Sequence, residues 1–514
     1  MGLSKTHGGA VLGVNATMIE VESNVSEGQL QYFFVGLPDN AVREGQLRIE
    51  AAVKNSGYMM PRRRVVVNLA PADIRKEGSA YDLTIAIGIL SASGELMETE
   101  DVSRYVIMGE LSLDGTLRPI KGALPIAIEA RRNKFKGFIL PKENAHEAAI
   151  VNDLEIYGAQ SLEEVIQLLR GKSTIKPTEV NTREEFAKNM TAYNMDFSDV
   201  KGQRNIKRAL EIAAAGGHNV ILIGPPGAGK TMLARRLPTI LPPLNINEAL
   251  ETTKIHSVAG KLASASSLLA VRPFRSPHHT ISDVALVGGG GNPQPGEISL
   301  AHNGVLFLDE LPEFKRTVLE VMRQPMEERR VTISRAKLSV DYPASFMLVA
   351  SMNPCPCGYY NHPEKQCVCA PGAVQKYLNK ISGPLLDRID LHVDVTPVSF
   401  DELTGKEQSE NSESVRQRVI AAREKQATRF AGQTDIHCNA QMPSNMIGKW
   451  CDVGEIGQRL LKTSMSRLQL SARAYDRILK VSRTIADLAG AENIQPEHLA
   501  EAIQFRTLDR GNIG

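Results

Sequence analysis

The sequence predicts an α/β fold in which parallel strands carry a phosphate-binding loop at their carboxyl ends. Two observations predict it. The apolar run Asn219 to Ile223 leads into a glycine-rich segment and then into a helical pattern, Met232 to Leu237. A second apolar run, Val305 to Leu308, ends on the carboxylates Asp309 and Glu310. Short apolar runs bounded by turn residues are typical of strands buried within a parallel sheet.

The glycine-rich segment matches G-x-x-x-x-G-K-[ST] in the strand–loop–helix context that this pattern requires. Glycines let backbone N–H groups turn inward around an anion, and the following helix points its positive end at the same place. We expect Lys230 to neutralise nucleotide β- and γ-phosphates and Thr231 to hold Mg²⁺. The predicted nucleotide-binding residues are Gly224, Pro225, Pro226, Gly227, Ala228, Gly229, Lys230 and Thr231.

The two carboxylates complete this prediction. Ligands of open α/β sheets bind beyond the carboxyl ends of the strands, which is where Asp309 and Glu310 fall. Asp309 is expected to position Mg²⁺, directly or through water. Glu310 is expected to take a proton from the attacking water, as a general base does. The sequence therefore predicts a nucleoside triphosphatase that uses ATP and Mg²⁺.

Length and composition limit the remaining possibilities. A chain of 514 residues is too long for one hydrophobic core, and 42% hydrophobic with 23% charged residues is ordinary for a soluble globular protein. A net charge of +2 excludes a strongly basic surface overall, so any nucleic-acid binding must come from local patches. The absence of an apolar stretch of about 18 residues or a signal pattern predicts a cytoplasmic protein without membrane contact.

Composition also suggests where the domains begin and end. Residues 1–170 alternate strand-like and helix-like segments, including a hairpin around Asp114-Gly115. Residues 171–195 are polar and read as a linker, and residues 196–395 contain the nucleotide motifs. Residues 396–514 repeat apolar residues at helical spacing and are expected to form a small helical lid. Within the third part, Gly288 to Gly291 is expected to be a flexible loop.

Three further motifs carry a family resemblance. They are Pro273-Phe-Arg-Ser-Pro-His-His-Thr-Ile-Ser282, Ser351-Met-Asn-Pro-Cys-Pro-Cys-Gly358 and Gly383-Pro-Leu-Leu-Asp-Arg-Ile-Asp390. With the phosphate loop and the Asp-Glu strand, they make the chain resemble the magnesium-chelatase-like AAA+ ATPases of the ComM/YifB family along essentially its whole length. The resemblance implies an AAA+ P-loop core followed by a C-terminal helical lid of the magnesium-chelatase type.

The same resemblance implies roles for three more residues. Asn353 matches the sensor residue that orients the attacking water. Arg388 matches the arginine finger, which acts on ATP held by a neighbouring subunit, and Arg473 matches the second sensor arginine of the lid. A finger supplied by a neighbour makes assembly a condition of activity. The implied partner is therefore a further copy of this chain, in a hexameric ring.

The family also carries two insertions, which fall here at about 256–300 and about 330–343. The second alternates as a hairpin does, with Arg335 and Lys337 near its tip. In related ring motors such hairpins line the pore and track DNA, single-stranded or branched; the alternative is an ordinary solvated hairpin. His278 and His279 lie in the first insertion. They are candidates for DNA contact, for reporting nucleotide state, or for polar surface, and the sequence does not choose.

The N-terminal part resembles the C-terminal protease domain of Lon, a fold of the ribosomal S5 domain 2 type with α+β architecture. Lys76 to Leu83 and Gly109 to Ile120 carry this resemblance. It raises a peptidase hypothesis with a serine nucleophile and a lysine base. Ala80 and Leu124 stand where the family has that dyad, with Ser79 and Lys121 displaced along the chain. We therefore expect a degenerate protease fold that serves as a scaffold or DNA-contact domain.

Four of the six cysteines cluster in two C-x-C pairs: Cys355, Cys357, Cys367 and Cys369. Four thiolates at this separation can surround a structural Zn²⁺, with His362 as a spare ligand. The alternative is four reduced cysteines without a metal.

Together these observations predict an ATP-driven ring motor that moves on DNA. By resemblance it would promote branch migration in recombination or in the uptake of transforming DNA. A protein-remodelling ATPase of the magnesium-chelatase type is the first alternative, and an ATP-dependent peptidase is the second.

Overall fold

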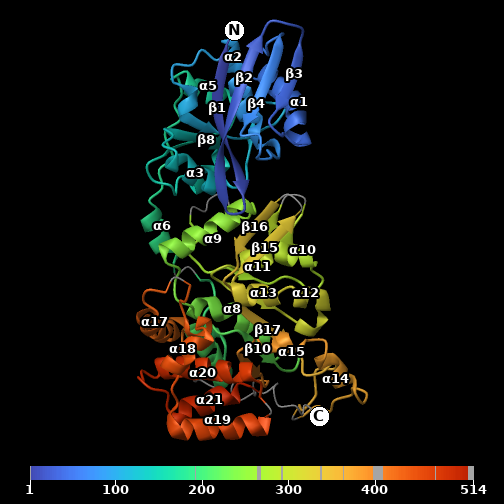
Figure 1. The fold of residues 1–514 in the computed structure, drawn as a ribbon, viewed down its shortest axis with the longest axis vertical. Helices are drawn as coiled ribbons and strands as arrows, with labels where there is room; N and C mark the ends of the chain where they lie inside the picture. The colour runs from blue at the N-terminus through green and yellow to red at the C-terminus, as the bar shows by residue number, and fades with distance from the viewer. Residues whose placement is uncertain are drawn as a thin grey trace.

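The computed structural model describes residues 2–190, 193–262, 268–290, 293–335, 338–362, 364–397, 409–433, 435–468 and 470–506. Two main sheets lie one beyond the other along the long axis of the molecule, and the C-terminal helices lie at the end opposite the N-terminus (Figure 1). No helix in these ranges is both long and apolar enough to cross a bilayer.

The N-terminal sheet is mixed. In the described part of the chain its strand order is β3-β4-β2-β1-β5-β8-β9. β1, β2 and β4 pair antiparallel, whereas the remaining neighbours are parallel. The strands are β1 (Leu3–Leu12), β2 (Asn15–Ser26), β3 (Gln31–Val35), β4 (Arg64–Ala70), β5 (Tyr105–Ile107), β8 (Gly137–Pro141) and β9 (Glu155–Ala159).

Helices accompany this sheet, and a small hairpin lies beside it. The helices are α1 (Asn40–Asn55), α2 (Asp82–Ser93), α3 (Ala123–Arg132), α4 (Lys142–Ala148) and α5 (Leu162–Leu169). The predicted hairpin is confirmed: β6 (Glu110–Leu111) pairs antiparallel with β7 (Leu117–Arg118) around Asp114-Gly115. Gly115 has a φ of +86°, a left-handed conformation that favours glycine. The segment after α5 includes one helix, α6 (Thr182–Asn189).

The second sheet is parallel, as the buried apolar runs predict. Its order is β11-β14-β17-β10-β18 within the described residues. The strands are β10 (Val220–Ile223), β11 (Phe274–Arg275), β14 (Val305–Leu308), β17 (Met347–Met352) and β18 (Leu391–Asp394). All residues of β10, β14 and β17 are buried. Because the carboxyl ends of parallel neighbours meet at one edge, the segments that follow these strands meet there too.

Helices surround this sheet and complete the first insertion. They include α7 (Arg204–Gly216), α8 (Lys230–Ile240), α9 (Ile246–Val258), α10 (Asp283–Val287), α11 (Glu297–Leu300), α12 (Arg316–Glu320), α13 (Arg323–Glu328), α14 (Ala373–Leu378) and α15 (Gly383–Leu386). The prediction of a flexible loop over Gly288 to Gly291 is wrong for Gly288 and Gly289, and Gly291 lies outside the described residues. β12 (Gly288–Gly289) pairs antiparallel with β13 (Gln294–Pro295), and a side chain at Gly288 would collide with the Gln294 carbonyl.

Helix α9, which leads into the first insertion, joins the two sheets. Helix α9 packs against α3, and the Gly122 N–H donates to the Ser257 carbonyl at 3.1 Å. The Ser257 hydroxyl donates to the buried carboxylate of Glu147. Ala249 of α9 belongs to the same apolar core as the N-terminal sheet. The N-terminal domain is therefore attached to the nucleotide domain by a packed, hydrogen-bonded contact in addition to the linker.

The second insertion is a hairpin, as predicted, with β15 (Arg330–Arg335) antiparallel to β16 (Leu338–Pro343). The turn between β1 and β2 reaches this hairpin (Figure 1). A Cβ on Gly13 would lie 2.8 Å from Val340 Cγ1, so the two hairpins are in direct contact. Lys337 and the side chain of Arg335 lie outside the described residues.

The C-terminal region is helical: α17 (Ser412–Arg429), α18 (Ser444–Trp450), α19 (Gly454–Leu468), α20 (Ala472–Leu488) and α21 (Pro496–Gln504). Its apolar residues share a core with α7 and α8. A buried polar contact reinforces this packing. Asp390, which precedes β18, accepts from Arg477 of α20 and from the Asn219 N–H at 2.9 Å. Burial disfavours its charged form, but Arg477 and the neighbouring His218 outweigh burial and hold the pKa of Asp390 well below its usual range.

Asp390→Ala is expected to destabilise the contact between the helical region and the core. Losing one partner of a fully buried pair costs about 3–5 kcal/mol. Because the Arg477 side chain is 21% exposed, we expect about 2–3 kcal/mol, measured as a shift in urea-unfolding midpoint. Since the folded pKa is depressed, the wild-type advantage is present above the ordinary carboxyl pKa and is lost as pH falls below it. Asp153→Ala, which removes the exposed Arg131 pair, is the control and should leave the midpoint nearly unchanged.

Candidate nucleotide-binding and hydrolysis site

The predicted phosphate loop lies between β10 and α8, as the sequence motif requires. Gly227 and Gly229 have φ values of +81° and +83°, so the loop uses glycine where other residues would be strained. The Gly224 N–H donates to the Met352 carbonyl at 3.2 Å, which ties the start of the loop to the end of β17. The loop is therefore fixed at the carboxyl edge of the sheet.

Lys230 is folded into this loop. Its ammonium donates to the carbonyls of Gly224 at 2.7 Å and Pro225 at 2.9 Å, and to Asn353 Oδ1 at 3.1 Å. Burial lowers the pKa of Lys230, while the charges of Asp309 and Glu310 act in the opposite direction. The predicted cation and the predicted sensor amide thus meet at the loop.

Asp309 is held by two hydroxyl groups. Thr231 donates to its Oδ2 at 2.8 Å, and Ser351 donates to its Oδ1. The oxygen atoms of Thr231 and Asp309 are the hard ligands that Mg²⁺ prefers, so the side chains fit the metal that a nucleotide would bring. Ser351 was not predicted as a site residue. Its position two residues before Asn353 was the available signal, because side chains two apart on a strand share one face.

Glu310, the next residue along the chain, has a backbone conformation that is unusual for a residue other than glycine. Its φ is +55°, in the left-handed region, and its backbone N–H donates to Asp309 Oδ1 at 3.1 Å. Non-glycine residues held there cost free energy and cluster at functional sites. The Glu310 side chain is 56% exposed, so it is open to water and a ligand. The geometry suits a general base that must reach a substrate water.

The structure places the two histidines beside this carboxylate. His279 Nδ1 lies 3.9 Å from Glu310 Oε2, and the His278 and His279 rings lie 4.0 Å apart between centroids. The sequence offered three roles for this pair without a choice between them. Their neighbourhood favours a link to the nucleotide site. The local sequence carried no signal of this, because the contact joins the first insertion to a different strand.

Arg388 is buried within its own chain. Its guanidinium contacts Glu327 of α13 at 2.6 Å and donates to the Pro384 carbonyl at 2.6 Å. Only 7% of the residue is exposed. Its Nε–H has no acceptor among the described residues. In a single chain, Arg388, the predicted arginine finger, is thus held by contacts within its own subunit. Its Nε–H is a donor that these contacts do not use.

Arg473 is placed differently. It lies in the first turn of α20, and its side chain is 62% exposed. Its contact with Asp387 Oδ2 spans 3.7 Å, an exposed pair that contributes little stability. Arg473 can therefore move toward a ligand at small cost.

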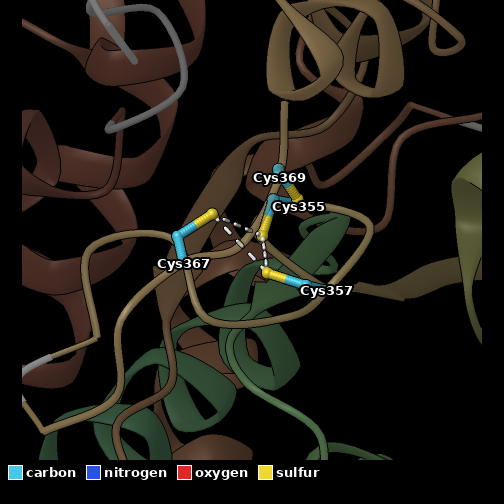
Figure 2. A group of neighbouring side chains, drawn as sticks. All are labelled: Cys355, Cys357, Cys367 and Cys369. Carbon is cyan, nitrogen blue, oxygen red and sulfur yellow. Dashed lines mark hydrogen bonds between the residues drawn. The ribbon is translucent and has the colours of Figure 1, made fainter. Parts of the chain in front are cut away.

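The four predicted cysteine ligands converge (Figure 2). Their sulfur atoms all lie within 4.8 Å of one another. His362, the spare ligand, instead accepts from the N–H groups of Glu364 and Lys365 through Nδ1. The cluster lies on the segment between Asn353 and α14, next to the nucleotide site in sequence.

The displaced serine and lysine of the N-terminal domain have other contacts. The Ser79 hydroxyl donates to Glu110. The Lys121 side chain lies against Gly260, beyond α9, and Leu124 is fully buried. These contacts favour the scaffold interpretation over an active dyad.

A parallel sheet with the phosphate-loop motif, the Asp-Glu pair and Asn353 at one edge has the arrangement of a P-loop nucleotide-binding core. Comparison with known families identifies its kind. Residues 196–403 match the family "Magnesium chelatase, subunit ChlI", residues 21–144 match "Subunit ChlI of Mg-chelatase", and residues 409–506 match the C-terminal region of the same subunit.

Individual relatives support the same family assignment. The chain is 44% identical to competence protein ComM of Haemophilus influenzae, over 99% of this chain and 98% of that protein. It is 44% identical to the uncharacterized protein YifB of Escherichia coli over the same shares. Lon protease 2 of Bacillus subtilis is 32% identical over 28% of this chain and 27% of its own length, so the Lon likeness is partial. The chain belongs to the ComM/YifB family of magnesium-chelatase-like proteins, which confirms the predicted resemblance and indicates an AAA+ ATPase.

Proposed function

We propose that this chain is an ATP-hydrolysing ring motor that acts on DNA, as a helicase or branch-migration factor in recombination or natural transformation. One observation carries the ATPase part. Two hydrogen bonds join the phosphate loop to segments far from it in the sequence: Lys230 donates to Asn353, and Thr231 donates to Asp309, both at one edge of the parallel sheet. This arrangement supports binding of a nucleoside triphosphate with its metal.

The chain's own residues have distinct tasks in this proposal. Lys230 leaves the loop carbonyls to bind the phosphates, and the loop N–H groups bind the remaining phosphate oxygens. Thr231 and Asp309 would hold Mg²⁺, which neutralises charge on the phosphates when bound. Asn353 orients a water molecule, and Glu310 takes its proton. Arg388 and Arg473 supply further positive charge at the boundary between subunits.

Two observations support DNA as the partner. A relative that matches nearly the whole chain is named for competence. The β15–β16 hairpin contacts the β1–β2 turn, and buried side chains of both its strands pack in the core beside the parallel sheet, so the hairpin is held in place. The sequence puts Arg335 and Lys337 at the turn between these two strands, and basic side chains there would suit contact with a phosphate backbone. The magnesium-chelatase family matches keep a protein-remodelling ATPase as the second candidate.

ATPase activity separates these candidates. Turnover is measured without DNA, with single-stranded DNA and with a branched junction, alongside mass in solution with nucleotide. A DNA motor is stimulated by DNA and assembles, in this proposal into hexamers. Activity indifferent to both DNAs would favour the remodelling ATPase, and a monomer at full activity would overturn the ring.

Neutralising the tip of the hairpin tests the DNA contact. Arg335→Ala with Lys337→Ala is expected to remove DNA stimulation and leave DNA-independent turnover unchanged. The salt dependence of single-strand binding should fall by about 0.7 in log–log slope for each phosphate that the variant no longer binds. The control removes two exposed cations of α19, Arg459 and Lys462, by the same substitution. An equal decrease in both double variants would show a nonspecific charge effect and contradict a hairpin contact.

A further inference from the structure

The cysteine cluster has the dimensions of a tetrahedral metal site. A Zn–S bond of 2.3 Å gives sulfur–sulfur edges of about 3.8 Å in a tetrahedron. Cys355 Sγ lies 3.3 Å from Cys357 Sγ and 3.8 Å from Cys367 Sγ, and the last two are 3.5 Å apart. Cys369 Sγ completes the group within 4.8 Å (Figure 2). Four soft thiolate ligands leave no open position, which is the arrangement of structural zinc sites.

The surrounding backbone supports the same assignment. The Tyr360 N–H donates to Cys355 Sγ at 3.3 Å, and the Gly358 N–H donates to the Cys355 carbonyl at 3.0 Å. Hydrogen bonds of this kind orient metal ligands. The six cysteines are all free thiols, so no disulfide holds this segment together.

The cluster touches the phosphate loop directly. Gly358, with a φ of +84°, is so close to Pro226 that a Cβ would lie 2.5 Å from Pro226 Cδ. Cys355 is fully buried and stands two residues after Asn353, whose amide oxygen accepts from Lys230. The cysteine segment therefore meets the loop at two points, at Pro226 through Gly358 and at Lys230 through Asn353.

The segment also leads to the arginine finger. Cys369 is followed by α14, then α15, and then Arg388. Lys380, between those helices, contacts Glu313, which follows the catalytic Asp-Glu pair. The described residues between Asn353 and α14 lie outside the strands and helices, so no ladder of backbone hydrogen bonds fixes them and a metal crosslink would hold the segment together.

We propose that Cys355, Cys357, Cys367 and Cys369 bind one structural Zn²⁺ that fixes this loop against the phosphate loop, so that nucleotide binding depends on zinc. The zinc takes no part in hydrolysis. It holds Gly358 against Pro226 and Asn353 beside Lys230. The inference has two halves. The first, the zinc site, depends only on the geometry of the sulfur atoms. The second, the effect of zinc on nucleotide binding, rests on the proposed nucleotide site.

Metal content tests the first half. The full chain, purified under reducing conditions, is expected to contain one zinc, and Cys357→Ser with Cys367→Ser is expected to contain none. Cys438→Ala, which removes a buried cysteine of another region, should keep the zinc. Wild-type protein stripped of zinc and given Co²⁺ should show the visible bands of a tetrahedral thiolate site. Iron in place of zinc, a disulfide among the four, or no uptake of either metal would overturn the site.

Nucleotide binding tests the second half. A fluorescent ADP analogue is titrated, with Mg²⁺, into wild-type, zinc-stripped and zinc-restored protein. We expect stripping to weaken binding by about tenfold or more, equivalent to about 1.4 kcal/mol, and zinc to restore it. Stripped wild-type protein avoids reliance on variants that fail to fold. Unchanged affinity in zinc-free protein would overturn the coupling, whereas a zinc-loaded protein that binds no nucleotide would refute the proposed function instead.

Discussion

Lys230→Ala is expected to abolish ATP turnover, and Glu310→Gln to lower it by about 10²–10⁴-fold while nucleotide binding persists. Lys230 is the cation inside the phosphate loop, and its present partners are two carbonyls and the Asn353 amide. Removing the ammonium group leaves the negative charge of the nucleotide phosphates without the positive charge that Lys230 would supply. The Glu310 side chain lies beside His279 and is 56% exposed, so its replacement removes the proposed base and leaves the hydrogen bonds within the loop intact.

The two variants are distinguished by measuring binding and hydrolysis separately. A fluorescent ATP analogue reports affinity, and release of inorganic phosphate reports turnover. Glu313→Gln is the matched control, because Glu313 is a nearby carboxylate engaged with Lys380 outside the site. It should keep wild-type turnover. Turnover that survives in Lys230→Ala would place the chemistry elsewhere, and loss of binding in Glu310→Gln would show that the Glu310 carboxylate contributes to nucleotide binding.

Local sequence was sufficient to predict which residues lie together at the centre of the candidate site. The phosphate loop is defined by residues that are adjacent in the chain, and its strand, loop and helix fold next to one another. Asp309 and Glu310 were predictable for a related reason: a parallel sheet brings the ends of its strands to one edge wherever they lie in the sequence. This general property of parallel sheets made the position of Asp309 and Glu310 predictable without knowledge of the tertiary structure.

Contacts between distant segments were not predictable in this way. Ser351 contacts Asp309 across two strands, and His279 approaches Glu310 from an insertion. The packing of Gly358 on Pro226 joins the cysteine segment to the phosphate loop. The His279 and Gly358 contacts depend on the detailed path of a loop, which no periodicity encodes, whereas the position of Ser351 on its strand was an available signal. The short ladder at Gly288–Gly289 was missed for the same reason, because a glycine run indicates turns until a partner strand is known.

Arg388→Ala is expected to lower turnover by about 10³–10⁵-fold without weakening nucleotide binding, because an arginine finger acts on the transition state and not on the bound substrate. Arg388→Lys should not rescue activity, since an ammonium cannot reproduce the planar guanidinium contact. The measurement is steady-state turnover beside nucleotide affinity. Weakened binding in Arg388→Ala would contradict a role confined to hydrolysis.

The contact with Glu327 provides the decisive control. If Arg388 serves only to pair with Glu327 inside its own subunit, Glu327→Gln should inactivate the enzyme as severely as Arg388→Ala. If Arg388 is a finger, Glu327→Gln keeps activity, because the exposed carboxylate merely holds the arginine until a neighbour's phosphates replace it. The Nε–H that lacks an acceptor among the described residues is consistent with such a second binding state.

Mixing inactive variants then shows whether the finger crosses a subunit boundary. Lys230→Ala lacks a working phosphate loop but retains Arg388, whereas Arg388→Ala has the reverse defect. When the two are assembled together, a boundary with the loop from one and the finger from the other contains a complete site, so turnover should reappear. A finger acting within its own chain gives no such recovery, because every subunit still lacks one half. Recovery in mixed rings, with Glu327→Gln active, would therefore establish hydrolysis at a shared boundary even though Arg388 is buried in the single chain.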